Sequence, residues 1–324
     1  MDIEAAFDDY QEAVNADPNL VKVARDRATT FEEAFEAEPD VEAAWLSGSL
    51  RRSTQLDPVH DVDMVIEYSA AEHPTWGKPG PSASAAIDHA RGRVKDLLGN
   101  PGGSVDELVR RADAAGKNRA VKCFVDDPGD PDAFTVDVMP VLRQADDTLL
   151  IPDAHRRGWT TANPEHLINL VQARQQAWTY FRPMVRVLKK WRLGVAGDVK
   201  IKSLVMEVLA LECLPVGLAR PDALARFFTA AATRVNQPIE DPAGHCGAIQ
   251  PDLDVTALRT ALEKDAYSAH EAQVAERRGN TDEALRLWQK VFGTDFPAPA
   301  ASGKSTIIGP ALISTQAMHN RPQG

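Results

Sequence analysis

Short runs of alternating apolar and polar residues occupy the chain between residues 41 and 141. The runs at residues 41–46, 61–67 and 134–141 are rich in valine and other residues that favour strands. A fourth alternating run covers residues 119–125. Pro140 limits the third run, because proline cannot donate to a ladder of hydrogen bonds. The pattern predicts β-strands in which every second side chain lies on the same face.

Helical patterns dominate the rest of the chain. Helices are expected at residues 3–16, 20–38, 85–98 and 105–115, with Asp17 and Pro18 as a break and a loop at residues 73–84. Asn163 followed by Pro164 marks the start of a further helix. From there, helical segments continue to about residue 291, with breaks near residues 194–197, 215–221 and 238–247.

Strands followed by helices predict an α+β chain, with antiparallel strands and helices on one face of the sheet. We expect N-terminal helices at residues 1–40 that pack along both lobes, a catalytic domain at 41–150 and a helical domain at 151–297. The segment from Phe296 onward is rich in proline, alanine, serine and glycine and has no helical period. We therefore expect a flexible tail at residues 298–324.

Composition limits the class of protein. The 324 residues are 44% hydrophobic, which is enough for a sizeable core. The sequence contains no run of 18 apolar residues, the length that a membrane-spanning helix needs. The acidic N-terminus lacks the features of a signal peptide, and three scattered cysteines do not form a disulfide framework. Cys246 follows His245, but no second pair completes a zinc site. We expect a cytoplasmic protein.

The net charge of −11 argues against binding long nucleic acids, because neutralising phosphates requires a basic surface. An acidic enzyme still binds free nucleotides through a local cluster and metal ions. The charge therefore favours small nucleotides as substrates.

Three aspartates carry the candidate chemistry. Asp61 and Asp63 lie two residues apart in one predicted strand, so their carboxylates share a face, and Asp137 lies in another strand. Three such carboxylates can hold two Mg²⁺ ions about 4 Å apart, the arrangement for in-line attack on a phosphoryl group. Gly48 and Ser49 precede them and open a helix whose backbone N–H groups face phosphates.

A solvated Asp-x-Asp is the common alternative, because most such pairs lie on strand edges or in turns. Gly48 and Ser49 at a suitable distance before the pair favour the catalytic interpretation. Asp137 between apolar residues favours it further, since a buried carboxylate is costly unless it is paired or binds metal.

These residues resemble the nucleotidyltransferase superfamily that includes DNA polymerase β. The strand at 135–140 resembles the VDVxP strand of oligoadenylate synthetases and of the bacterial CD-NTases, relatives of cyclic GMP–AMP synthase. The segments at 186–191, 202–207, 241–242 and 288–293 resemble further CD-NTase motifs, and the resemblance covers about residues 20–297. It implies a polymerase-β-like sheet followed by an oligoadenylate-synthetase-like helical domain.

The resemblance also implies roles for single residues. Lys189 and Ser203 match residues that contact the donor triphosphate in the family, whereas a solvated basic helix face is the alternative for Lys189 and its neighbours Arg182, Arg186 and Lys190. Leu204 stands where relatives have a tyrosine that stacks on a base, so the stacking residue is not assigned. Trp191 and Trp288 are expected in the core.

The implied activity is the Mg²⁺-dependent joining of ATP and other NTPs, with release of pyrophosphate, into a cyclic second messenger. That messenger would act on a downstream effector in CBASS defence against phage. Two metal ions are implied, with Mn²⁺ as an alternative to Mg²⁺. The competing hypotheses are a transferase acting on tRNA ends or a small molecule, and an inactive nucleotide-binding module.

Two features of the tail could carry a function. Residues 303–306 imitate a phosphate-binding loop, but Ala298 stands where that loop requires glycine, so we reject it. Gly324 suits attachment to another protein by a ubiquitin-transfer-like partner, because glycine leaves the terminal carboxylate unobstructed. An ordinary disordered end is the alternative.

Overall fold

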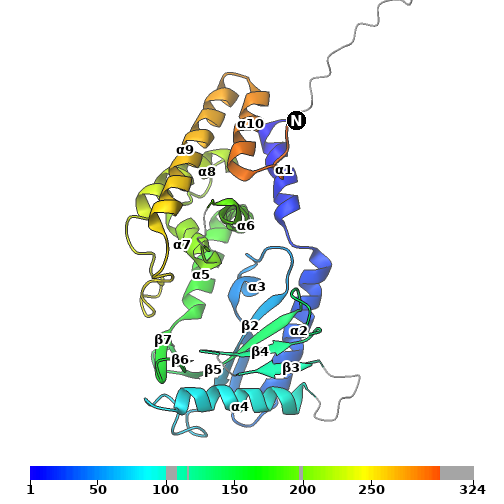
Figure 1. The fold of residues 1–324 in the computed structure, drawn as a ribbon, viewed down its shortest axis with the longest axis vertical. Helices are drawn as coiled ribbons and strands as arrows, with labels where there is room; N and C mark the ends of the chain where they lie inside the picture. Colours follow the sequence, from blue (N-terminus) through cyan, green and yellow to red (C-terminus); the bar gives the residue numbers. More distant parts are fainter. Residues whose placement is uncertain (100–107, 115–116, 197–199, 300–324) are drawn as a thin grey trace, which may run out of the picture.

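A strand-rich lobe and a helical lobe form an elongated molecule (Figure 1). The computed structural model describes residues 1–99, 108–114, 117–196 and 200–299. The sheet lobe contains the strands β1 (Val41–Leu46), β2 (Asp61–Tyr68), β3 (Arg111–Asp113), β4 (Val121–Phe124), β5 (Thr135–Arg143), β6 (Leu149–Asp153) and β7 (Gly158–Ala162). The α+β class predicted from the sequence is confirmed.

The order of the main strands is β1-β2-β5-β4-β3, and β6 and β7 extend the sheet from β5. Strands β2 and β5 run parallel, while the other pairs are antiparallel. The expectation of a wholly antiparallel sheet is therefore wrong. The long connection from β2 to β5 contains a helix and two strands, which gives the chain enough length to return and enter the sheet in the same direction.

Two helices cover one face of the sheet, as predicted. Helix α2 (Pro18–Glu36) and helix α4 (Ser82–Leu97) share one core with the inward side chains of β2 and β5, among them Val62, Met64 and Val136. These apolar residues alternate with Asp61, Asp63 and Asp137. Burial of the alternate positions therefore turns the three carboxylates toward the opposite face.

Two parts of the sheet differ from the sequence prediction. Residues 111–113 form β3, paired with β4, although a helix was expected at 105–115; residues 105–107 and 115 lie outside the described ranges. Pairing with a neighbouring strand outweighs the weak local helix preference of this polar segment. Strands β6 and β7 were not expected at all.

The helical lobe consists of α5 (Pro164–Ala177), α6 (Phe181–Trp191), α7 (Ser203–Cys213), α8 (Arg220–Arg234), α9 (Val255–Arg277) and α10 (Thr281–Phe292), with a short helix of one turn at Arg192–Gly194. The Asn163 side chain caps α5 by accepting a hydrogen bond from the His166 backbone N–H, as its sequence position predicts. Trp191 and Trp288 are buried in the common core of these helices, which confirms that prediction.

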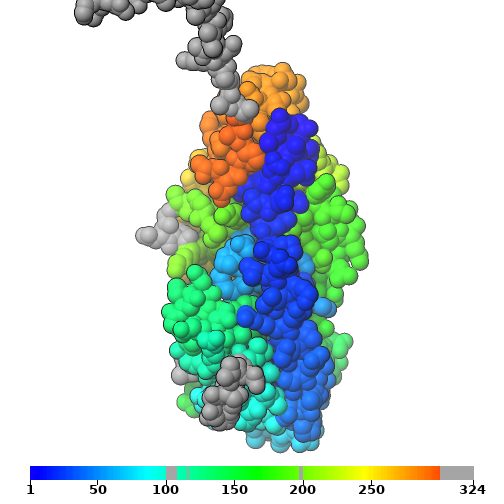
Figure 2. Space-filling model, turned by 90° about the vertical axis from the view of Figure 1, so that its right-hand side faces the viewer, coloured from blue at the N-terminus to red at the C-terminus, as the bar shows by residue number. Residues whose placement is uncertain are grey.

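The N-terminal helices run along both lobes (Figure 2). Helix α1 (Ile3–Val14) contacts α6, α8 and α10, whereas α2 contacts β1 and β2. Residues 296–299 form no helix or strand, as expected, but Phe296 itself is fully buried against Phe7 and Tyr10. The predicted attachment through Gly324 lies outside the described residues and stays a prediction.

Within the described ranges, none of the helices combines the length and the apolar character needed to cross a membrane.

Candidate active site

The three predicted catalytic carboxylates meet where β2 and β5 run side by side. In the parallel register Asp63 lies opposite Asp137, and Asp61 lies opposite Thr135. The Thr135 hydroxyl donates a hydrogen bond of 3.0 Å to Asp61 Oδ1, which fixes that carboxylate at the start of the strand. Asp61, Asp63 and Asp137 thus share one face across two adjacent strands, and we call them the catalytic carboxylates after their predicted role.

Gly48 fits a place that no larger residue could occupy. It begins the short helix α3 (Gly48–Arg52) at the end of β1, with a positive φ of 62°. A Cβ atom on Gly48 would lie 1.8 Å from Asp63 Oδ2. The Ser47 backbone N–H also donates to the Asp63 carbonyl at 2.7 Å. The turn carrying Gly48 and Ser49 therefore packs directly on a catalytic carboxylate.

The catalytic carboxylates repel one another. Desolvation, followed by repulsion from Asp61 and Asp137, raises the pKa of Asp63 to about 6. Desolvation and the Asp61 charge also raise the pKa of Asp137. Among the residues that the structure describes, Asp137 Oδ1 is a buried acceptor that receives no hydrogen bond. Such an acceptor is available to bind a cation or to accept a hydrogen bond from a ligand.

Lys122 on β4 is a site residue that the sequence did not reveal. Its Nζ lies 3.7 Å from Asp61 Oδ1 and 3.7 Å from Asp137 Oδ1, because β4 pairs with β5 and places Lys122 opposite Asp137. The ammonium group offsets part of the negative charge of the cluster. Only the register between β4 and β5 identifies this lysine, since its local sequence matches an ordinary exposed strand position.

The donor set fits a divalent metal ion. Carboxylate oxygens from three positions are hard ligands of the kind that Mg²⁺ and Mn²⁺ prefer. The pKa values of Asp63 and Asp137 are raised, and Asp137 Oδ1 receives no hydrogen bond from the residues that the structure describes. A bound cation would stabilise carboxylates that lie this close together.

Lys189 lies in a buried ion cluster between the lobes. Its Nζ is 2.7 Å from Glu207 Oε2 and donates hydrogen bonds of 3.0 Å to both the carbonyl and the hydroxyl of Thr54. Arg52 donates to Glu207 Oε1 at 2.5 Å. We call Arg52, Thr54, Lys189 and Glu207 the inter-lobe cluster. It joins the segment after Gly48 to helices α6 and α7.

Ser203 and Ser49 lie on elements that meet at this junction. Ser203 is the first residue of α7 and precedes Glu207 by four positions, so both side chains share one face of the helix. Ser49 is half-buried in α3, three residues before Arg52. The inter-lobe cluster therefore holds the two predicted phosphate-contacting segments against each other.

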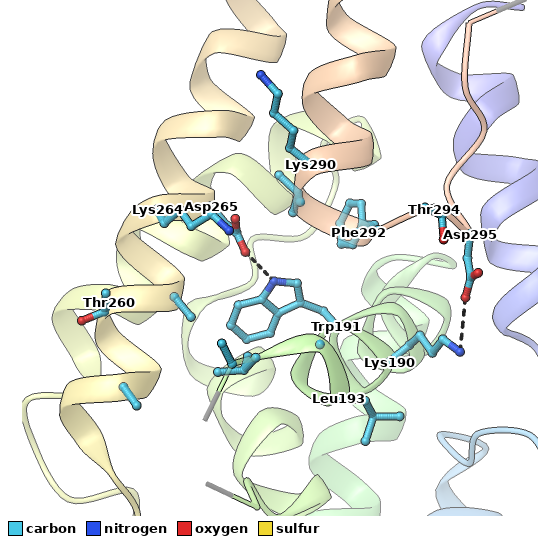
Figure 3. A pocket seen from close by; sticks show the side chains of 17 residues that line it. Lys190, Trp191, Leu193, Thr260, Lys264, Asp265, Lys290, Phe292, Thr294 and Asp295 are labelled. Atoms are coloured by element: carbon cyan, nitrogen blue, oxygen red, sulfur yellow. Dashed lines mark hydrogen bonds and ion pairs between the residues drawn. The ribbon is translucent and has the colours of Figure 1, made fainter. Parts of the chain in front are cut away.

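The helical lobe contains a separate cavity of about 640 Å³ (Figure 3). Its lining includes Lys190, Lys264 and Lys290, and Trp191 Nε1 donates to Asp265 Oδ2 at 2.8 Å at its base. Neither the catalytic carboxylates nor Gly48, Ser49, Lys189 and Ser203 line this cavity. The size of a cavity is thus not what identifies the active site in this molecule.

Comparison with known proteins supports the predicted resemblance. No family model matches the chain. A curated relative, a cyclic AMP-AMP-AMP synthase from an Acinetobacter species, is 24% identical over 312 residues, which cover 86% of this chain and 84% of the relative.

Solved structures share the fold. The Escherichia coli MS115-1 CdnC with ATP has a TM-score of 0.70 at 19% identity, over 92% of this chain and 99% of that chain. The Bradyrhizobium diazoefficiens CD-NTase CdnG, solved with GTP, has a TM-score of 0.63 at 14% identity, over 88% and 97% of the two chains. The chain therefore has the fold of the CD-NTases, as the resemblance at Gly48, Asp61 and Asp137 implies.

Proposed function

We propose that this protein is a metal-dependent nucleotidyltransferase that joins nucleoside triphosphates into a cyclic oligonucleotide, a second messenger for an effector in anti-phage defence. The observation that carries the proposal is the register of β2 and β5. It brings Asp63 opposite Asp137 with Asp61 on the same face, directly against the turn at Gly48.

Each part of the site has one task in this proposal. Backbone N–H groups at Gly48 and Ser49 bind the donor triphosphate, and Ser203 donates a hydrogen bond to it. Asp137 faces the acceptor hydroxyl and is the candidate general base. Two Mg²⁺ ions held by Asp61, Asp63 and Asp137, with Mn²⁺ as an alternative, would neutralise phosphate charge and lower the pKa of the acceptor hydroxyl when bound.

Contact between Lys189 and the triphosphate is part of the proposal, and the structure sets a condition for it. Lys189 is 1% exposed, and its Nζ already pairs with Glu207 and donates to Thr54. A triphosphate must therefore draw Nζ away from at least one of these partners. Donor binding would then weaken the contacts of Lys189 within the inter-lobe cluster while Lys189 forms a new contact with the phosphate.

Similar proteins indicate which substrate to test first. The Acinetobacter relative is described as a synthase of a cyclic triadenylate, and CdnC was solved with ATP. ATP is therefore our proposed donor. A CdnC structure also contains a HORMA protein, so a partner of that kind is a candidate regulator here.

The test is incubation of the purified protein with radiolabelled ATP, the other NTPs and Mg²⁺ or Mn²⁺, followed by phosphatase treatment and chromatography. We expect a phosphatase-resistant product that carries the label, together with free pyrophosphate. Label transferred to added tRNA or to a small molecule would support the competing transferase instead. Metal-dependent binding of ATP without any pyrophosphate release, with or without the candidate regulator, would support an inactive nucleotide-binding module.

A further inference from the structure

A second cluster of metal-binding side chains lies at the far end of β1 and β2. Asp40 immediately precedes β1, His73 lies in the loop after β2, and His89 lies on α4. Within the described residues, one ligand atom from each side chain lies within 4.8 Å of the others. We call these three residues the His–Asp cluster.

The cluster is separate from the catalytic carboxylates. Asp61 is the first residue of β2, and Tyr68, which packs against both histidines, is the last. A strand rises about 3.3 Å per residue, so about 23 Å separates the two ends of this strand. An ion bound at the His–Asp cluster would not touch the reacting phosphates.

Both histidines direct the same nitrogen toward the same oxygen. His73 Nε2 lies 3.0 Å from Asp40 Oδ2, and His89 Nε2 lies 3.1 Å from it. Two metal bonds of about 2.0–2.1 Å at a tetrahedral angle place their outer atoms about 3.3 Å apart. The two nitrogen–oxygen distances thus already approach those between ligand atoms in a metal site, and the two nitrogens lie within 4.8 Å of each other.

The surroundings resemble the support that metal ligands need. The second Asp40 oxygen, Oδ1, accepts a hydrogen bond of 3.2 Å from Arg93, which also pairs with Glu38. Ligating carboxylates are commonly held in this way by an outer hydrogen bond. The carboxylates of Asp40 and Glu38 and the guanidinium of Arg93 together carry one net negative charge beside the two imidazoles, which favours a cation.

Aromatic residues enclose the cluster, and the Tyr68 hydroxyl among them is a buried polar group. The Trp76 ring stacks on His73 at a centroid distance of 3.9 Å. Tyr68 is 1% exposed, and its hydroxyl has no hydrogen-bond partner in the part of the chain that the structure describes. A buried hydroxyl of this kind indicates a water or an ion close by.

We propose that Asp40, His73 and His89 bind one transition-metal ion, with Zn²⁺ as the best fit, and a water as the fourth ligand. Imidazole nitrogens select Zn²⁺ over Mg²⁺, which prefers oxygen. The ion would join the segment before β1, the loop after β2 and helix α4. Its role is to stabilise the sheet lobe, and it does not depend on nucleotidyl transfer.

The test uses the variant with Asp61→Asn and Asp63→Asn, so that the catalytic carboxylates do not bind the probe. After removal of metals with a chelator, this variant is titrated with Co²⁺ and followed by visible absorption. We expect the ligand-field bands of a four- or five-coordinate site at one ion per chain. Adding His73→Ala or His89→Ala should weaken Co²⁺ binding by more than about tenfold.

A matched control separates this site from surface binding. His270→Ala removes an exposed histidine from α9 and should leave the Co²⁺ bands unchanged. If the histidine variants do not fold, the parent variant still gives an answer, because Zn²⁺ but not Mg²⁺ should raise its unfolding temperature. Absence of bands and of any Zn²⁺ effect would show a hydrogen-bonded cluster only. Bands that persist without His73 and His89 would likewise overturn the proposal.

Discussion

Two carboxylate-containing clusters near the junction of the lobes have opposite electrostatics. Among the catalytic carboxylates, desolvation and mutual repulsion raise the pKa of Asp63 to about 6. In the inter-lobe cluster, burial alone would raise the pKa of Glu207, yet the charges of Lys189 and Arg52 lower it to about 2. One cluster thus needs a cation from solution, whereas the other contains its own.

The difference separates a binding site from a structural joint. Glu207 is fully buried and accepts from Arg52, Lys189 and Thr54, so its charge is satisfied inside the protein. Among the residues that the structure describes, the ion-pair partner of the catalytic carboxylates is Lys122, whose Nζ lies 3.7 Å from Asp61 and from Asp137. Repulsion that persists in the folded protein is what a site for divalent ions shows before the ions bind.

The largest effect should follow from removing a catalytic carboxylate. Asp61→Ala or Asp63→Ala should lower nucleotide transfer by about a thousandfold or more, because metal ions contribute several kcal/mol to lowering the barrier. Incorporation of labelled ATP measures this, with circular dichroism as a check on folding. Asp252→Asn, at an exposed position, should match the wild type. Wild-type turnover in the Asp61→Ala, Asp63→Ala double variant would refute the catalytic assignment.

Removing the charge of the inter-lobe cluster should affect stability instead. Glu207→Gln leaves Arg52 and Lys189 without their carboxylate, and loss of one member of a buried pair costs about 3–5 kcal/mol of unfolding free energy. Glu212→Gln on the same helix removes an exposed partner of Arg234 and should cost less than about 1 kcal/mol. Urea denaturation compares the two. Equal costs would mean that burial does not distinguish Glu207.

A smaller effect is expected at the phosphate-contacting serine. Ser203→Ala should raise the KM for ATP about tenfold, because it removes one hydrogen bond to a charged group. Metal binding to the free protein should not change. Steady-state kinetics against ATP concentration measures this, with the exposed Ser84→Ala as control. An unchanged KM would show that the family's serine motif has been placed on the wrong residue.

The smallest effect is a gain in stability without metal. Asp63→Asn should raise the unfolding temperature of the metal-free protein by about 1–2 °C at pH 7.5, roughly 1 kcal/mol after allowance for solvent screening. Because the pKa of folded Asp63 is about 6 and its ordinary value is 3.8, the cost of its charge is fully present above pH 6. The advantage of the variant should therefore shrink as the pH falls below 6 and vanish near pH 4. Scanning calorimetry across this range would contradict the account if the advantage grew on acidification.

The sequence predicted the catalytic carboxylates because their signal is local. Asp61 and Asp63 share a face by strand periodicity, and Gly48 precedes them at a fixed distance. Lys122 was missed because its contribution depends on the register between β4 and β5. The same reason hid the His–Asp cluster, whose members are far apart in the chain and meet only in the folded sheet lobe.

Partners across the molecule explain the other differences. The sequence marked Lys189 as a phosphate contact, but it could not show that Glu207 and Thr54 already surround this lysine. Residues 111–113 form a strand because they pair with the neighbouring strand β4. Strands β2 and β5 are parallel because the long chain between them returns to the same end of the sheet. Local preference does not encode such pairings.

The most direct test of the contrast is to count Mn²⁺ ions bound together with a non-hydrolysable ATP analogue, by electron paramagnetic resonance. We predict that the wild type and Asp252→Asn bind Mn²⁺ with the analogue, and that the Asp61→Asn, Asp63→Asn variant loses this binding by at least about tenfold. This readout needs no turnover. Equally tight binding of Mn²⁺ and analogue after removal of both charges would contradict the assignment of these carboxylates as the metal site.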